Sequence, residues 1–154
     1  MPKAVSERPS RWRRLQSRRV VVHDESMAPT LLPGDRLLVD RDAYRDRSPT
    51  PGDIVVFVDP ETPTRWLIKR VAGVGPGRFW KTREGLRPAP AESTAEEVPP
   101  SDSIEAIVLE PSAVYVAGDS ETARDSRQFG PIPISSLLGR AYQCYAPVHR
   151  RRDL

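Results

Sequence analysis

The chain has 154 residues, of which 38% are hydrophobic, and 24 Lys and Arg stand against 21 Asp and Glu. This length suits one domain with a real core, and the apolar runs are strand-sized, far short of the roughly 18 residues of a membrane-spanning helix. The single cysteine excludes an internal disulfide framework, and the N-terminus lacks the pattern of a secretory signal.

Positive charge is concentrated at both ends of the chain. Residues 1–19 contain seven Lys and Arg against one Glu, and residues 150–154 contain three Arg against one Asp. We predict a disordered basic arm over 1–18 and a basic tail over 147–154. Such an arm suits an anionic membrane surface, or it is simply solvated. Nucleic acid is disfavoured, because no groove-reading motif accompanies the charge. We therefore expect a cytoplasmic or peripherally membrane-associated protein.

The body of the chain has the pattern of a mostly β protein. Turn signals of the Pro-Gly-Asp type recur, and 17 prolines with nine glycines leave little room for long helices. Many short strands separated by regular turns predict an antiparallel barrel or sandwich. A Pro- and Ser-rich stretch over 87–103 predicts a flexible inserted loop. The expected strands are 19–23, 35–40, 53–59, 65–75, 78–82, 104–109, 113–118 and 137–146.

Ser26 is a candidate nucleophile because of the turn in which it lies. In Ser26-Met27-Ala28-Pro29-Thr30-Leu31, the proline fixes its φ angle and commits the chain to a turn. A serine on such a turn can present its hydroxyl and its own backbone N–H to one point, as acyl transfer requires. The alternative is an ordinary loop serine before the next strand.

Lys69 is the candidate base. It lies in the apolar strand 66–72, and a lysine accepts a proton only when it is neutral. Lowering its pKa from about 10.4 to about 7 disfavours the charged form by roughly 4–5 kcal/mol. Burial among apolar side chains, with no carboxylate nearby, would supply that shift. The alternative is a surface lysine. His23 is too close to Ser26 in an extended segment to be the base, and His149 lies near the C-terminus.

These two segments and a third over 118–133 together resemble the type I signal peptidase family, serine endopeptidases with a Ser–Lys dyad. The third contains Gly118-Asp119 and Asp125-Ser126-Arg127-Gln128-Phe129-Gly130-Pro131. The resemblance covers residues 20–142. It implies a coiled antiparallel β catalytic core over 19–146 with a variable insertion at 78–110, catalytic Ser26 and Lys69, and neither cofactor nor metal.

The resemblance also implies supporting roles for residues around the dyad. Asp125 should pair with Arg70, and Arg127 with Asp119, so that the closing loop is held against the lysine strand. These pairs have the alternative of being ordinary surface ion pairs of little consequence.

At two positions the sequence departs from the family pattern. Relatives often have a second oxyanion donor two residues before the nucleophile, where this chain has Asp24, and an ionised carboxylate cannot donate. Relatives also have a lysine-orienting serine where this chain has Ala123. Thr122 or Ser120 could take that role after a shift in register.

The substrate implied by the resemblance is an extended peptide of a precursor protein, added as a strand beside 19–23 and 65–69 and cleaved after small residues. One variant is signal-peptide removal, and another is soluble maturation of a specific precursor. A repressor-like autoprotease and a catalytically weak or inactive binding module are alternatives from other classes. The expected lining of the substrate site is Val22, Met27, Leu31, Leu67 and Ile68.

Overall fold

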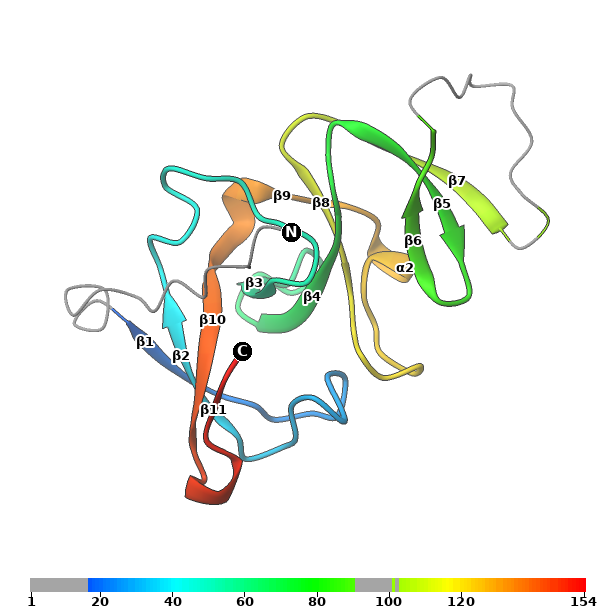
Figure 1. The fold of residues 1–154 in the computed structure, drawn as a ribbon. Coiled ribbons are helices and arrows are strands. Elements are labelled where there is room, and N and C mark those ends of the chain that lie inside the picture. The colour runs from blue at the N-terminus through cyan, green and yellow to red at the C-terminus, as the bar shows by residue number, and fades with distance from the viewer. Residues whose placement is uncertain (1–16, 91–100, 102) are drawn as a thin grey trace, which may run out of the picture.

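A coiled antiparallel sheet makes up most of the computed structural model, which describes residues 17–90, 101 and 103–154. Its strands pair in the order β1-β2-β10-β3-β4-β8-β9, and β11 pairs with β10 (Figure 1). The predicted mostly β, antiparallel fold is confirmed. The strand bounds are β1 Arg18–Val21, β2 Arg36–Asp40, β3 Ile54–Val58, β4 Trp66–Val74, β8 Ala113–Ala117, β9 Ile132–Pro133, β10 Leu137–Ala146 and β11 Arg152–Asp153.

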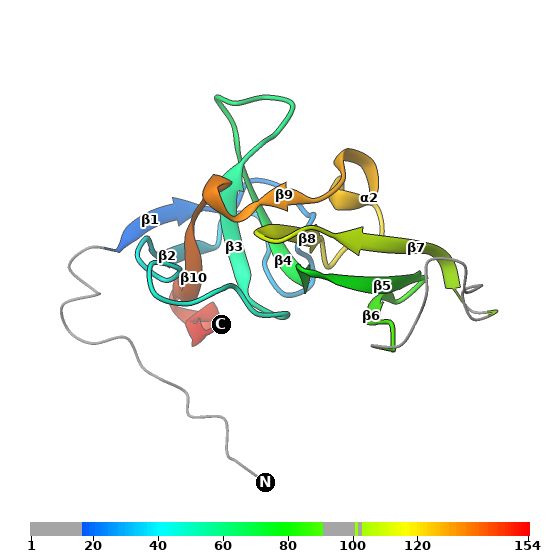
Figure 2. The same ribbon diagram turned by 90° about the horizontal axis from the view of Figure 1, so that it is seen from above.

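A second, smaller sheet lies to one side of the first (Figures 1 and 2). It consists of β5 (Gly77–Thr82), flanked by β6 (Gly85–Pro88) and β7 (Ser103–Leu109). The predicted insertion therefore forms a sheet of its own. Of the predicted flexible loop, residues 91–100 and 102 lie outside the described part of the chain. The helical segments are short: α2 Ser126–Phe129, η1 Ile134–Ser136 and η2 Val148–Arg150.

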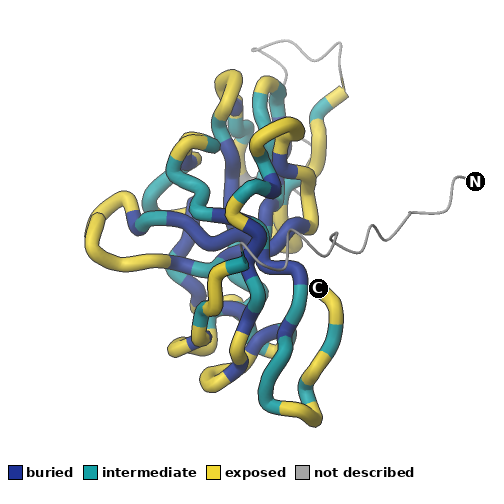
Figure 3. Tube along the Cα trace, turned by 90° about the vertical axis from the view of Figure 1, so that its left-hand side faces the viewer, coloured by how far each residue is buried: buried dark blue, intermediate teal, exposed yellow. Residues whose placement is uncertain are grey.

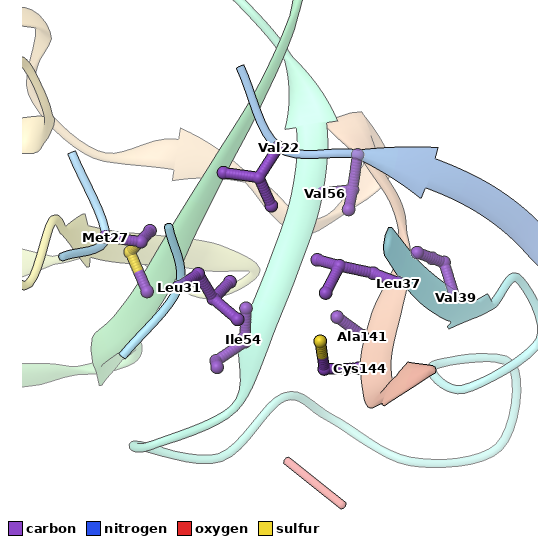
Figure 4. Close-up of a cluster of buried hydrophobic side chains, with 9 residues drawn as sticks. All are labelled: Val22, Met27, Leu31, Leu37, Val39, Ile54, Val56, Ala141 and Cys144. Atoms are coloured by element: carbon purple, nitrogen blue, oxygen red, sulfur yellow. The ribbon is translucent and has the colours of Figure 1, made fainter. Parts of the chain in front are cut away.

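The longest apolar run of the sequence forms β3. It contains no polar residue because both faces of this strand are buried. Ile54 and Val56 pack into one hydrophobic cluster, which Figure 4 shows, while Val55 and Phe57 pack into another on the opposite face. Successive side chains of a strand point to opposite faces. A strand covered on both sides therefore loses the usual apolar–polar alternation. Figure 3 shows buried positions gathered along the centre of the molecule, with exposed ones at the loops.

The C-terminal residues form part of the fold, so the prediction of a separate basic tail is wrong. β11 pairs with β10, and the Leu154 N–H donates to the Tyr142 carbonyl over 2.9 Å. Arg150 Nε lies 2.7 Å from Oδ1 of the buried Asp35. Arg150 and Arg152 also donate to the Thr30 carbonyl. The last residues of the chain thus hold the end of the Ser26 turn.

At the other end, residues 1–16 of the predicted basic arm lie outside the described residues. The last two predicted arm residues are ordered: the Ser17 hydroxyl lies 2.8 Å from the Tyr142 hydroxyl, and Arg18 begins β1. The Arg18 guanidinium lies over the Trp66 ring, 4.1 Å from its centroid. Within residues 17–90, 101 and 103–154, no helix has the length and apolar character needed to cross a membrane.

Candidate active site

The Ser26 turn connects β1 to β2 and is held by backbone hydrogen bonds and by two buried apolar side chains. The Leu31 N–H donates to the Met27 carbonyl over 2.8 Å, and the Ala28 N–H donates to the Glu25 carbonyl over 2.9 Å. Met27 and Leu31 are buried in the hydrophobic cluster of Figure 4. The two apolar anchors of the motif fix the turn, which leaves Ser26 only partly covered.

β4 carries Lys69 into the interior beside this serine. Its side chains alternate, with Leu67, Lys69 and Val71 buried on one face. The Lys69 side chain is only 2% exposed, which confirms its predicted burial. Nζ lies 2.7 Å from Ser26 Oγ and 3.1 Å from the carbonyl oxygen of Ile68. The structure therefore brings nucleophile and base together within hydrogen-bond distance, as proton transfer between them requires.

The environment of Lys69 lowers its pKa. Burial disfavours the ammonium and is the largest influence. The charges of Asp24 and Asp125 act in the opposite direction, and those of Arg65 and Arg124 reinforce burial. The expectation that no carboxylate would be near the lysine is therefore wrong, although burial dominates.

This direction predicts the pH dependence of turnover. Only neutral Lys69 can accept the Ser26 proton, so activity should rise with pH through the lowered pKa of Lys69. We expect kcat/KM to reach its plateau clearly below pH 10.5, the ordinary pKa of the group. A pH–rate profile with a short peptide substrate measures this, and a rate still climbing at pH 10.5 would mean that Lys69 is not the base.

The closing loop between β8 and α2 packs directly on the nucleophile turn. The Ser120 N–H donates to the Ser26 carbonyl over 3.0 Å. A Cβ added to Gly118 would lie 2.6 Å from the same carbonyl oxygen and 2.2 Å from Cβ of Ala123. Only glycine permits this close approach, so the Gly-Asp dipeptide of the motif has a steric role.

The ion pairs of this loop differ from the predicted ones. Arg70 binds Asp119 with two hydrogen bonds of 2.9 and 2.7 Å. Arg127 binds Asp125 with bonds of 2.9 and 2.8 Å. The predicted pairing of Arg70 with Asp125, and of Arg127 with Asp119, is therefore wrong. The four residues are the predicted ones, but the partners are exchanged.

Asp125 organises the loop from a fully buried position. Its carboxylate accepts the Gly118 N–H over 2.8 Å and caps α2, where Gln128 completes a capping box. Burial by itself raises the pKa of Asp125. The bonds from Arg127 and from the backbone N–H groups of Gly118 and Arg127 outweigh burial and lower the pKa overall.

Thr122 does not orient Lys69, as had been suggested from the sequence. Its hydroxyl is exposed and lies 3.2 Å from the Ser120 hydroxyl. Lys69 Nζ instead bonds to the Ile68 carbonyl of its own strand, in addition to Ser26. Ala123, where the resemblance implied a serine, is buried against Gly118. A backbone carbonyl thus orients the lysine where a hydroxyl was expected.

Asp24 accepts the hydrogen bond of the Ser26 backbone N–H, the group that was expected to stabilise the oxyanion. Its Oδ1 accepts the Ser26 N–H over 2.9 Å. Partial burial raises the pKa of Asp24, but hydrogen bonds from the Ser26 hydroxyl and N–H, and the charges of Lys69 and Arg65, lower it overall. Asp24 is therefore an anion beside the nucleophile.

A groove of about 550 Å³ runs past Ser26 between residues 19–24 and 64–68. The Val22 N–H and carbonyl bond to residues 34 and 35, so the backbone groups of Val21 and His23 point the other way, toward the groove. On the far side, the backbone groups of odd-numbered residues of β4 face β3. Those of Trp66 and Ile68 are therefore directed away from β3.

Most of the predicted lining residues do line this groove. Val22, Met27, Leu67 and Ile68 are all found there. Leu31 was predicted wrongly: it is 0% exposed and belongs to the core below the turn. The prediction missed the polar and aromatic lining, which is Arg19, His23, Asp24, Thr64, Arg65 and Trp66.

A second hollow of about 680 Å³ adjoins the groove, with Val20 and Trp66 lining both, and contains neither dyad residue. Among the described residues, no group of three or more His, Cys, Asp or Glu could hold a metal ion.

Comparison with known proteins agrees with this geometry. Residues 13–87 match the model of the family described as signal peptidase, peptidase S26. The chain is 40% identical over 117 residues to mitochondrial ATP-independent inner membrane protease subunit 1b of Arabidopsis thaliana, covering 75% of this chain and 62% of that protein. It is 31% identical over 140 residues to probable signal peptidase I-1 of Synechocystis sp., covering 84% of this chain and 71% of that protein.

The chain belongs to the signal peptidase family. The predicted family is thereby confirmed, and with it the predicted class of enzyme, a serine-type endopeptidase of the signal peptidase type. This membership favours a peptidase over a repressor-like autoprotease. The chain spans 62% of the length of the plant relative.

Proposed function

We propose that this signal peptidase family member cleaves extended peptides with Ser26 as nucleophile and Lys69 as general base. The observation that carries the proposal is the 2.7 Å separation of Lys69 Nζ and Ser26 Oγ, with the lysine buried and its pKa lowered. A solvated lysine at the same distance would remain protonated at neutral pH and could not act as the base.

The dyad would act in two steps. Ser26 Oγ attacks the carbonyl carbon of the scissile bond while Lys69 Nζ takes the hydroxyl proton. That proton passes to the leaving amine as the C–N bond breaks, and an ester remains on Ser26. Lys69 then removes a proton from water, and the resulting nucleophile attacks the ester. The proton on Lys69 passes to Ser26 Oγ as the ester C–O bond breaks, which restores the free serine and the neutral lysine.

The groove supports an extended precursor or signal peptide as the substrate. A strand placed between residues 19–24 and 64–68 could bond to the backbone groups directed into the groove on both sides. Val22, Met27, Leu67 and Ile68 provide apolar walls, which suit small side chains just before the cleaved bond. Relatives named as signal peptidase I agree with this substrate class.

Peptides with an Ala-x-Ala sequence test this proposal. We expect cleavage after the second alanine, and a penem-type acylating inhibitor should leave an adduct that mass spectrometry assigns to Ser26. A matched peptide with Phe at both alanine positions should be cleaved at least about tenfold more slowly. Intact peptides and an unlabelled Ser26 would contradict the proposal.

We further propose that the enzyme acts at an anionic membrane surface through its basic N-terminal residues. Seven Lys and Arg lie in residues 1–19, and each contributes about 1 kcal/mol close to such a surface. A relative named as an inner membrane protease agrees with this setting. The full chain should sediment with vesicles that contain anionic phospholipid, less so as salt is added, and not with phosphatidylcholine alone. Absence of binding at low salt would contradict membrane attachment.

A further inference from the structure

Asp24 is placed where it interferes with the chemistry of the dyad. It lies two residues before Ser26 and lines the groove, and its Oδ1 is 2.9 Å from the Ser26 backbone nitrogen. In acyl transfer, a nucleophile's own N–H is well placed to stabilise the oxyanion that forms on the attacked carbonyl. In this structure, that N–H already donates to a carboxylate.

The carboxylate and the oxyanion cannot share this position. Both are anions and both need a donor, and an ionised carboxylate has no proton to offer. If Asp24 stayed in place, the oxyanion would lose the N–H and would also be repelled by a negative charge within a few ångströms. Turnover at Ser26 therefore requires Asp24 to move.

Arg65 offers Asp24 a second position. Its Nη2 lies 3.9 Å from Asp24 Oδ2, and Arg65 belongs to the opposite wall of the groove. The two side chains are 58% and 54% exposed, so neither is locked in place by the core. Exposed ion pairs are worth little in free energy, and a small difference in energy therefore separates the two positions of Asp24.

The negative charge of Asp24 also affects the pKa of Lys69, the proposed base. Four charged groups influence Lys69: Asp24, Asp125, Arg65 and Arg124. Asp125 is engaged by Arg127 and the Gly118 N–H, whereas Asp24 lines the groove and accepts the Ser26 N–H, which a substrate carbonyl can take over. The negative charge of Asp24 favours the protonated form of Lys69, which cannot accept the Ser26 proton.

We propose that Asp24 closes the oxyanion-binding position of the free enzyme and must turn from the Ser26 N–H toward Arg65 when a peptide carbonyl enters. This inference rests on the proposed dyad and adds a residue that controls it. Asp24 is a brake on turnover: it competes for the oxyanion donor, and its charge favours the protonated form of the base. A peptide that fills the groove displaces it, so occupancy of the groove completes the site.

Substitution of Asp24 tests the proposal through acylation of Ser26 by a penem-type inhibitor. Asp24→Ala should accelerate acylation about tenfold or more, because one oxyanion donor is worth about 10²–10³ in kcat. The acidic limb of its pH profile should also move to lower pH. Asp24→Asn, which keeps an acceptor oxygen without the charge, should show the same pH displacement with a smaller gain in rate. Arg65→Gln should slow acylation more in the wild-type background than with Asp24→Ala.

Glu25→Ala is the matched control, because this acidic neighbour does not line the groove and its backbone contact to Ala28 is retained. It should change neither rate nor pH profile. The amide resonance of Ser26 gives a readout without catalysis: in the free enzyme, it should titrate with Asp24, and it should not do so in Asp24→Ala.

Three results would overturn the proposal. Asp24→Ala acylated no faster than wild type, with an unchanged melting temperature, would refute the brake while leaving the dyad intact. A Ser26 amide resonance that does not shift as Asp24 titrates would refute the contact between the two residues. Absence of acylation in both proteins, with normal amide titration, would refute the proposed dyad and the brake with it.

Discussion

Ser26→Ala and Lys69→Met should each reduce peptide cleavage by about a thousandfold or more. The first removes the attacking oxygen. The second removes the amine 2.7 Å from it and retains a side chain of similar length in the buried site. The double variant should be little worse than either single variant, because the two groups act as one unit. Steady-state cleavage of an Ala-x-Ala peptide measures all three.

Lys81→Met and Ser120→Ala are the matched controls. Lys81 lies on the smaller sheet, where it pairs with Glu105, and the backbone contact of Ser120 to Ser26 survives removal of its hydroxyl. Neither substitution should change kcat/KM by more than about twofold. Appreciable turnover by Lys69→Met at neutral pH would remove Lys69 from the mechanism.

Lys69→Met should also stabilise the protein, which separates loss of function from loss of fold. The pKa of Lys69 is lower in the folded protein than its ordinary value of 10.5, so the unfolded chain binds the additional proton. The lysine therefore destabilises the fold most below its folded pKa, and this effect disappears above pH 10.5. At neutral pH, we expect a gain of about 1 kcal/mol, visible as a higher melting temperature.

The parts of the fold that the sequence predicts well are governed by local chemistry. The turn at Pro29 and the strand β4 depend on neighbouring residues, and both were placed correctly. β3 was also found, because an apolar run of five residues bounded by turns suits a strand buried on both faces. The contact of Asp24 with the Ser26 N–H had a local signal too, since acidic side chains commonly accept an N–H two residues on.

Long-range partners could not be predicted in the same way. Arg70 has two aspartates within the same short loop, and only the path of that loop decides that it meets Asp119 and not Asp125. Asp35 and Arg150 are separated by 115 positions, and nothing in either segment indicates the other. A sequence does not show which of several aspartates pairs with a given arginine, because the pairing depends on where the side chains lie in the fold.

Asp125→Ala should be the most destabilising substitution in the closing loop. It leaves the Gly118 N–H without its acceptor, removes the N-cap of α2 and deprives Arg127 of its partner. Breaking a buried, hydrogen-bonded pair in this way should lower the free energy of unfolding by about 2–4 kcal/mol. Because the loop also holds the Ser26 carbonyl through Ser120, peptidase activity should fall as well.

Chemical denaturation measures this loss, with Asp42→Ala as the control, since the half-buried Asp42 pairs with the exposed Arg45 three residues on. The control should cost no more than about 0.5 kcal/mol. The pKa of Asp125 is lowered in the fold, so its stabilisation is complete above its unfolded pKa of 3.8 and is lost as the pH falls toward the folded pKa. The difference between wild type and Asp125→Ala should therefore shrink in acid. Equal effects of the two substitutions at neutral pH would show that the buried carboxylate does not hold the loop.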